Sequence, residues 1–199
     1  MKAMNLALLG ALLFGPAAHA GIITYVTTLS GASEVPPTGS PGTGSAFVIV
    51  DTTLQTMEVD ETFAGLLGTT TASHIHCCTA TPLAGNAGVA TQVPYFTGFP
   101  LGVTSGSYDH TFDLTLASTY NPAFITAEGG TVALAEAALL GGLAAGETYL
   151  NIHSNVDPSG EIRGYLVPAA SVPEPATFLV TGALLVGLAI RRRCGLRSR

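Results

Sequence analysis

Hydrophobic and polar positions alternate along much of the middle of this chain. In residues 107–116 one face would carry Tyr108, His110, Phe112, Leu114 and Leu116, and the other Asp109, Thr111, Asp113 and Thr115. A period of two residues is that of a half-buried β-strand. Segments rich in β-branched and aromatic residues predict further strands at 22–29, 45–50, 56–66, 148–154 and 161–167.

Residues 121–146 break this alternation. Asn121 and Pro122 are typical of the N-cap and the first position of a helix, and an Ala/Leu-rich run begins after Thr131. The fold class predicted is therefore mainly β, an antiparallel sandwich with one short helical insertion at about 121–145 between two strands.

The first 20 residues have the layout of a secretory signal peptide. Lys2 precedes the apolar run 6–14, and Ala-His-Ala at 18–20 is a small-x-small cleavage site. We expect cleavage between Ala20 and Gly21, with a short buried helix as the alternative.

Residues 169–199 have a different character from the domain at 21–168. Pro173, Glu174 and Pro175 precede an apolar run at 178–190, which predicts a membrane helix, and then an arginine cluster at 191–193 that favours the cytoplasmic side. These three parts, in this order, resemble the PEP-CTERM sorting signal of Gram-negative bacteria. The resemblance implies the secretion machinery and an exosortase as partners, transient anchoring in the inner membrane, and export to the cell surface or extracellular matrix. A plain membrane anchor is the alternative, and both place residues 21–168 outside the cytoplasm.

The charge of the chain changes once its ends are set aside. The whole chain carries −6, but residues 21–171 hold twelve acidic residues and one basic residue, Arg163, for a net charge of −11. Such a domain repels nucleic acid and anionic membrane, so nucleic acid is excluded as a partner.

Histidines and cysteines are concentrated in Thr-Ala-Ser-His-Ile-His-Cys-Cys-Thr-Ala at 71–80. On a strand His74 and His76 share one face and Ile75 takes the other, so we expect Ile75 in the core and both imidazoles outward. The same pattern turns His153 outward from the strand at 148–154. If the two strands are neighbours, the three imidazoles converge on one copper or zinc ion. The alternative is a structural role, in which they hydrogen-bond across strands and cap loops.

Such a site could hold only one metal ion, because the segment after His76 supplies no histidine or carboxylate ligands for a second one. No His, Asp or Glu occurs between His76 and Asp109. His110 lies on the apolar face of its strand, and we expect it at the edge of the core rather than as a fourth ligand.

Cys77 and Cys78 would lie in an oxidising compartment after export. Neighbouring Cα atoms are about 3.8 Å apart, below the ~4.4–6.8 Å usual for disulfides. A disulfide between them therefore requires a distorted turn, and the alternative is one buried cysteine with the other facing the histidines. No Cys-x-x-Cys motif points to a thioredoxin-like role.

Arg163 and Glu161 are expected to be structural. Alternation places both on one face, with Ile162 inward, so Arg163 would pair with Glu161 or Glu34, or cap loop carbonyls. Guiding anions toward a metal is the alternative.

Four ordered motifs resemble the CHRD (chordin-like) domain over about residues 22–167: LSGASEVPP at 29–37, SHIHCC at 73–78, YLNIHS at 149–154 and GEIRGYL at 160–166. The resemblance implies an immunoglobulin-like sandwich, distantly similar to copper-zinc superoxide dismutase, and no established catalytic activity. The dismutase family places a His-x-His pair and a later strand histidine on copper, as His74, His76 and His153 would be here.

The chain has no Gly-x-Ser-x-Gly elbow and its domain has no lysine for a phosphate loop. We therefore expect a non-enzymatic exported protein with a structural or adhesive role and an unknown extracellular partner. A mononuclear copper- or zinc-binding protein is the first alternative, and a superoxide-handling enzyme is the second.

Overall fold

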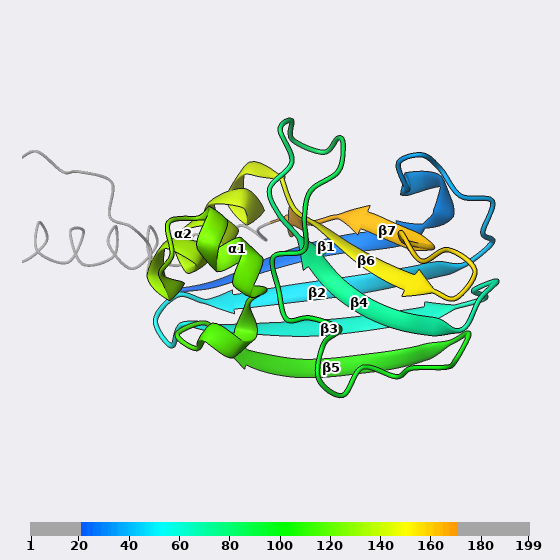
Figure 1. Ribbon diagram of the computed structural model, residues 1–199, viewed down its shortest axis with the longest axis horizontal. Coiled ribbons are helices and arrows are strands. Elements are labelled where there is room, and N and C mark those ends of the chain that lie inside the picture. The colour runs from blue at the N-terminus through cyan, green and yellow to red at the C-terminus, as the bar shows by residue number, and fades with distance from the viewer. Residues whose placement is uncertain (1–20, 171–199) are drawn as a thin grey trace, which may run out of the picture. The chain divides into compact units, whose positions relative to one another are not determined.

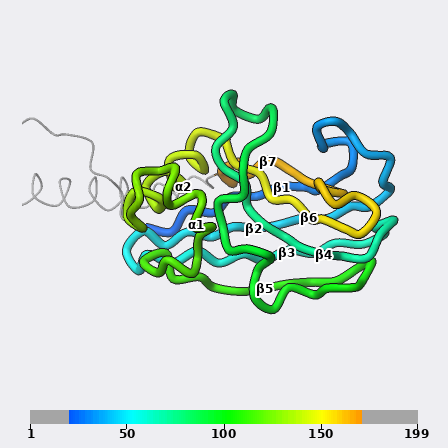
Figure 2. Tube along the Cα trace, in the orientation of Figure 1, coloured from blue at the N-terminus to red at the C-terminus, as the bar shows by residue number. Residues whose placement is uncertain are grey.

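The computed structural model describes residues 21–170, in which eight strands form one antiparallel sheet. The strands are β1 (Ile22–Ser30), β2 (Thr43–Asp51), β3 (Thr56–Ala64), β4 (Thr70–His76), β5 (Gly106–Asp113), β6 (Tyr149–Ser154), β7 (Ile162–Tyr165) and β8 (Val167–Pro168). Their order is β4-β6-β7-β1-β2-β3-β5, and β8 pairs with β1. The sheet curls so that its ends face each other (Figures 1 and 2), and a hydrogen bond from Ser73 on β4 to Glu61 on β3 crosses the enclosed core. The prediction of a mainly β, sandwich-like antiparallel fold is confirmed.

The helices lie where the sequence predicted them, between β5 and β6. They are α1 (Pro122–Ala127) and α2 (Val132–Ala145). Of two short 3-10 turns, η1 (Gly31–Ser33) follows β1 and η2 (Ala117–Thr119) lies between β5 and α1. The Asn121 side chain accepts a hydrogen bond from the first turn of α1, and Thr131 does the same for α2. Figure 1 shows both helices at one end of the sheet, where α2 buries Ala135, Leu139 and Leu143 in the core.

Two predicted strands end earlier than expected. The strand predicted at 56–66 stops at Ala64, because Gly65 adopts a φ of +72° that turns the chain. The strand predicted at 107–116 stops at Asp113, whose carboxylate accepts from the Thr115 N–H and closes a turn. Leu116, beyond that turn, is exposed rather than in the core.

Burial does not alternate along β4 and β6. Every residue of β6 is buried, and so is every residue of β4 except Thr71. The loop 77–105 and the loop 155–161 cover the face of these strands that points away from the core, as their hydrogen bonds to it show. This second buried face holds the candidate site.

The predicted signal peptide and sorting signal lie outside the described residues. Within residues 21–170, no helix has the length and apolarity needed to cross a bilayer.

Candidate metal centre

Three histidines meet on the covered face of β4 and β6. The two strands are antiparallel neighbours, with Ala72 opposite His153 and His74 opposite Asn151. His74 and His76 therefore share a face with His153, and one ring nitrogen of each lies within 4.8 Å of those of the other two. Among residues 21–170, this is the one group of three or more metal-capable side chains so closely placed.

The imidazoles point away from the core, as alternation predicted, but loops cover them and they are not exposed to solvent. His74, His76 and His153 are 6%, 7% and 9% exposed. Alternation also placed Ile75 correctly in the core, where it is fully buried. A strand's own pattern does not reveal that a covering loop buries the opposite face as well.

Each histidine is held by one backbone carbonyl. The ring nitrogens lie 2.7–3.0 Å from carbonyl oxygens, in the pairs His74 Nε2 with Pro94, His76 Nδ1 with Ala87, and His153 Nδ1 with Pro158. A carbonyl only accepts, so each of these nitrogens carries the ring proton and the other nitrogen keeps a free lone pair.

The three remaining ring nitrogens are buried without a hydrogen-bond partner among the described residues. They are His74 Nδ1, His76 Nε2 and His153 Nε2. Metal-binding histidines in proteins have this same arrangement, with one nitrogen donating to a carbonyl and the other on the ion. The cluster can thus present three neutral nitrogen ligands to a single cation.

Burial keeps these imidazoles neutral. Together with a smaller contribution from the neighbouring His153, it lowers the pKa of His74 and of His76 to about 4. The pKa of His153 is also lowered by burial. A metal ion therefore does not have to displace protons from these side chains near neutral pH.

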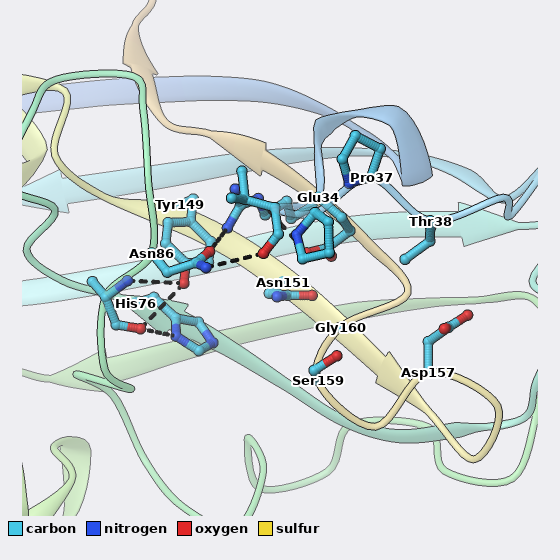
Figure 3. A pocket seen from close by; sticks show the side chains of 14 residues that line it. Glu34, Pro37, Thr38, His76, Asn86, Tyr149, Asn151, Asp157, Ser159 and Gly160 are labelled. Atoms are coloured by element: carbon cyan, nitrogen blue, oxygen red, sulfur yellow. Dashed lines mark hydrogen bonds and ion pairs between the residues drawn. The ribbon is translucent and has the colours of Figure 1, made fainter.

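Aromatic packing fixes the ring of His76. Tyr149 stacks on it with centroids 4.6 Å apart and planes 9° from parallel, and the Tyr149 hydroxyl donates to the same Ala87 carbonyl. The Arg163 guanidinium lies 4.5 Å from the centroid of the Tyr149 ring. Figure 3 shows His76 and Tyr149 near each other at one end of a pocket.

Arg163 pairs with Glu34, and the alternative pairing with Glu161 was wrong. The Arg163 side chain is 1% exposed, and its Nε lies 2.6 Å from the Ser33 carbonyl and 3.7 Å from Glu34 Oε2. Its Nη1 donates to Asn86 Oδ1 at 2.6 Å. Burial raises the pKa of Glu34 to about 7, although Arg163 opposes the shift.

Glu161 instead anchors the turn that follows β3. Its carboxylate accepts from the amides of Leu67 and Gly68 and from the Ser40 hydroxyl. Burial favours a raised pKa for Glu161, but these hydrogen bonds hold its pKa below the ordinary value. Glu161 and Arg163 thus have separate partners: Glu161 binds the turn after β3, and Arg163 binds Ser33 and Asn86.

His110 and the cysteines stand apart from the cluster. His110 is exposed on β5, with its ring centroid 4.6 Å from that of Phe112. Cys77 and Cys78 form a disulfide with each other, which decides between the two alternatives. Both sulfurs lie against Gly142 of α2.

Sequence reasoning missed Asn151 and the carbonyls that hold the rings. Asn151 lies two residues before His153 and so shares its face, a signal that the alternation already contained. No local pattern identifies the carbonyls of Ala87, Pro94 and Pro158, since they belong to loops without periodicity.

The comparison with protein families assigns this arrangement to a known domain. The CHRD domain matches residues 25–166, a span that contains the three histidines, the disulfide and Arg163. The chain belongs to the CHRD domain family. Membership of this family is consistent with an extracellular or periplasmic role. No curated protein and no solved structure matches the chain, so the similarity of this CHRD domain to immunoglobulin and dismutase sandwiches stays a prediction.

Proposed function

We propose that this CHRD domain binds one copper or zinc ion through His74, His76 and His153. The observation that carries the proposal is the set of three buried, unpartnered ring nitrogens that face one another.

A purely structural role explains only half of the hydrogen bonding. Each histidine does fasten a loop through one nitrogen, but the other nitrogen is left buried without a partner. A buried polar atom without a partner costs about 1–3 kcal/mol, and three such atoms in one place is a rare arrangement. One shared cation would satisfy all three.

The ligand types favour copper or zinc over harder cations. Neutral imidazole suits both ions, whereas magnesium and calcium prefer the oxygen ligands that this cluster lacks. The net charge of −11 on residues 21–171 also favours a bound cation.

The cellular setting we propose follows from the chain's ends. The signal peptide at 1–20 and the PEP-CTERM signal at 169–199 would deliver the domain, through an exosortase, to the cell surface or extracellular matrix. There the domain would have a structural or adhesive role rather than a catalytic one. Unchanged surface delivery of a Glu174→Ala variant would count against this route.

Metal content of the purified full-length protein tests the metal proposal. The protein is stripped with a chelator, loaded with copper or zinc, dialysed and analysed for metal per chain. We expect one ion for the wild type and His110→Ala, and none above background for His76→Ala. His110→Ala is the matched control, since it removes an exposed imidazole outside the cluster. Wild-type protein without stoichiometric metal, or a His76→Ala variant that keeps it, would contradict the proposal.

A further inference from the structure

A polar pocket adjoins the histidine cluster. Its volume is about 370 Å³, within the range of small-molecule sites (about 300–1,000 Å³). Glu34, Tyr149, Asn151, Asp157 and Arg163 contribute to its lining, and His76 is part of the same wall. Figure 3 shows Glu34, which follows η1, near Tyr149 and Asn151 of β6 and Asp157 of the loop 155–161; Arg163 comes from β7.

Two hydrogen-bond acceptors in this pocket have no partner among the described residues. They are Asn151 Oδ1 and Glu34 Oε1, on side chains that are 2% and 6% exposed. Figure 3 shows the Asn151 amide inside the pocket, with no dashed line reaching it. Buried acceptors of this kind need a donor to offset the loss of water.

Gly160 holds the Asn151 amide in this position. The Gly160 backbone has a φ of +133°, and a Cβ built on it would collide with the Asn151 amide. Any other residue here would push Asn151 out of place, so the loop is shaped around this amide.

Arg163 supplies donors to the same space. A guanidinium has five N–H groups, and the three hydrogen bonds of Arg163 go to Ser33, Asn86 and Tyr165. Two further N–H groups have no hydrogen bond among the described residues, and Arg163 lines the pocket. The pocket thus offers acceptors and donors close together, all on buried side chains.

The charged side chains of the pocket disfavour a free anion or a free cation as its ligand. A free anion would meet the carboxyls of Glu34 and Asp157, and a free cation would meet Arg163. A neutral ligand avoids both conflicts. A hydroxyl group donates one hydrogen bond and accepts others, so neighbouring hydroxyls can satisfy the acceptors and Arg163 together.

We propose that this pocket binds a small neutral hydroxylated molecule, of the polyol or sugar class, through Glu34, Asn151 and Arg163. The site goes beyond the proposed metal function and does not depend on it, because none of its three recognition groups is a metal ligand.

Saturation-transfer NMR on the full-length protein tests this, with glycerol, glucose and mannose as the probes. We expect transfer to at least one probe, both with and without bound metal. Asn151→Leu keeps the size of the side chain but removes its amide, and should weaken binding at least tenfold. Asp109→Asn, an exposed change on β5, is the control and should bind as the wild type does.

A second variant covers the case in which Asn151→Leu does not fold. Ser159 is exposed at the pocket, so Ser159→Trp obstructs it without disturbing the core, and should also abolish transfer. The proposal is overturned if the wild type shows no transfer with any of the three probes, or if both variants bind as the wild type does. Transfer only in the metal-loaded protein also overturns it, because the ligand would then be held by the ion. Transfer without metal, alongside failed metal loading, would support the pocket and refute only the metal proposal.

Discussion

The rings of His74 and His153 stand edge to face with their centroids 5.1 Å apart, yet each donates its proton to a loop and not to the other ring. His74 donates to Pro94 and His153 to Pro158. The strands therefore bring the rings together, but the covering loops decide which nitrogen of each ring is left free.

Metal affinity should resist acid. Burial lowers the pKa of His74 and His76 to about 4, against an ordinary value of 6.5, so protons compete with the metal only as the pH falls toward 4. We expect the zinc affinity of the protein to stay nearly constant from about pH 8 to about pH 6 and to fall steeply between about pH 5 and pH 4. Competition with a chromophoric chelator at each pH measures it. An affinity that declines steadily from pH 6.5 downward would contradict this assignment.

Glu61 should make the protein less stable as the pH rises. This carboxyl is fully buried on β3, and burial raises its pKa to about 8 from 4.5, although the Ser73 hydrogen bond opposes the shift. Between these values the folded state keeps a proton that the unfolded state releases, so the Glu61 contribution to stability falls with rising pH. The slope is at most about 1.4 kcal/mol per pH unit.

Glu61→Gln removes this titration. Its free energy of unfolding, relative to the wild type, should rise from about pH 5 to about pH 8 and then level off. Urea unfolding at a series of pH values measures the difference. A difference that is constant across the range would show that Glu61 is ionised in the folded protein.

Arg163 should be among the most costly residues to replace. Arg163→Met removes the hydrogen bonds to Ser33 and Asn86 and leaves Glu34 buried without its cation. We expect a loss of about 3–5 kcal/mol in the free energy of unfolding. Arg163→Lys keeps the charge but not the geometry of the guanidinium, and should lose less. If Arg163→Met lost under about 1 kcal/mol in urea unfolding, the ion pair would not have the structural role assigned to it.

The disulfide should make any side chain at Gly142 destabilising. A Cβ at Gly142 would lie 2.5 Å from the Cys77 sulfur and 2.7 Å from the Cys78 sulfur, whereas a Cβ at Gly141 would meet nothing within 4 Å. Gly142→Ala should therefore lower stability by about 1–3 kcal/mol. Gly141→Ala, on the same helix, should raise it by about 0.5–1 kcal/mol.

A double-mutant cycle tests whether the cost of Gly142→Ala comes from the contact with the two cysteine sulfurs. Replacing Cys77 and Cys78 with alanine removes both sulfurs, and in that background Gly142→Ala should lose most of its cost. Thermal unfolding of the four proteins measures the coupling. An unchanged cost would place the clash elsewhere, for example on Thr148, whose Cγ2 lies 3.2 Å from the same Cβ.

Many of the strands and helices could be predicted because their sequence signals involve residues that are near one another in the chain. Period-two alternation located β5, and β-branched and aromatic content located β1, β2, β3, β6 and β7. Asn121 and Thr131 marked the helix starts, since a cap acts within one turn. The boundaries at Ala64 and Asp113 were missed because single turns, not periodicity, end those strands.

The sequence by itself determined that His74 and His76 share a face opposite Ile75, because successive side chains of any strand point to opposite sides. Only the tertiary structure decided that this face is buried, that His153 joins it, that Arg163 lies beside Glu34 and not Glu161, and that Cys77 bonds Cys78. These outcomes depend on how the curled sheet pairs its strands and where the loops 77–105 and 155–161 fold back. Such contacts join residues far apart in the chain, or depend on a loop conformation, and neither leaves a periodic trace in the sequence.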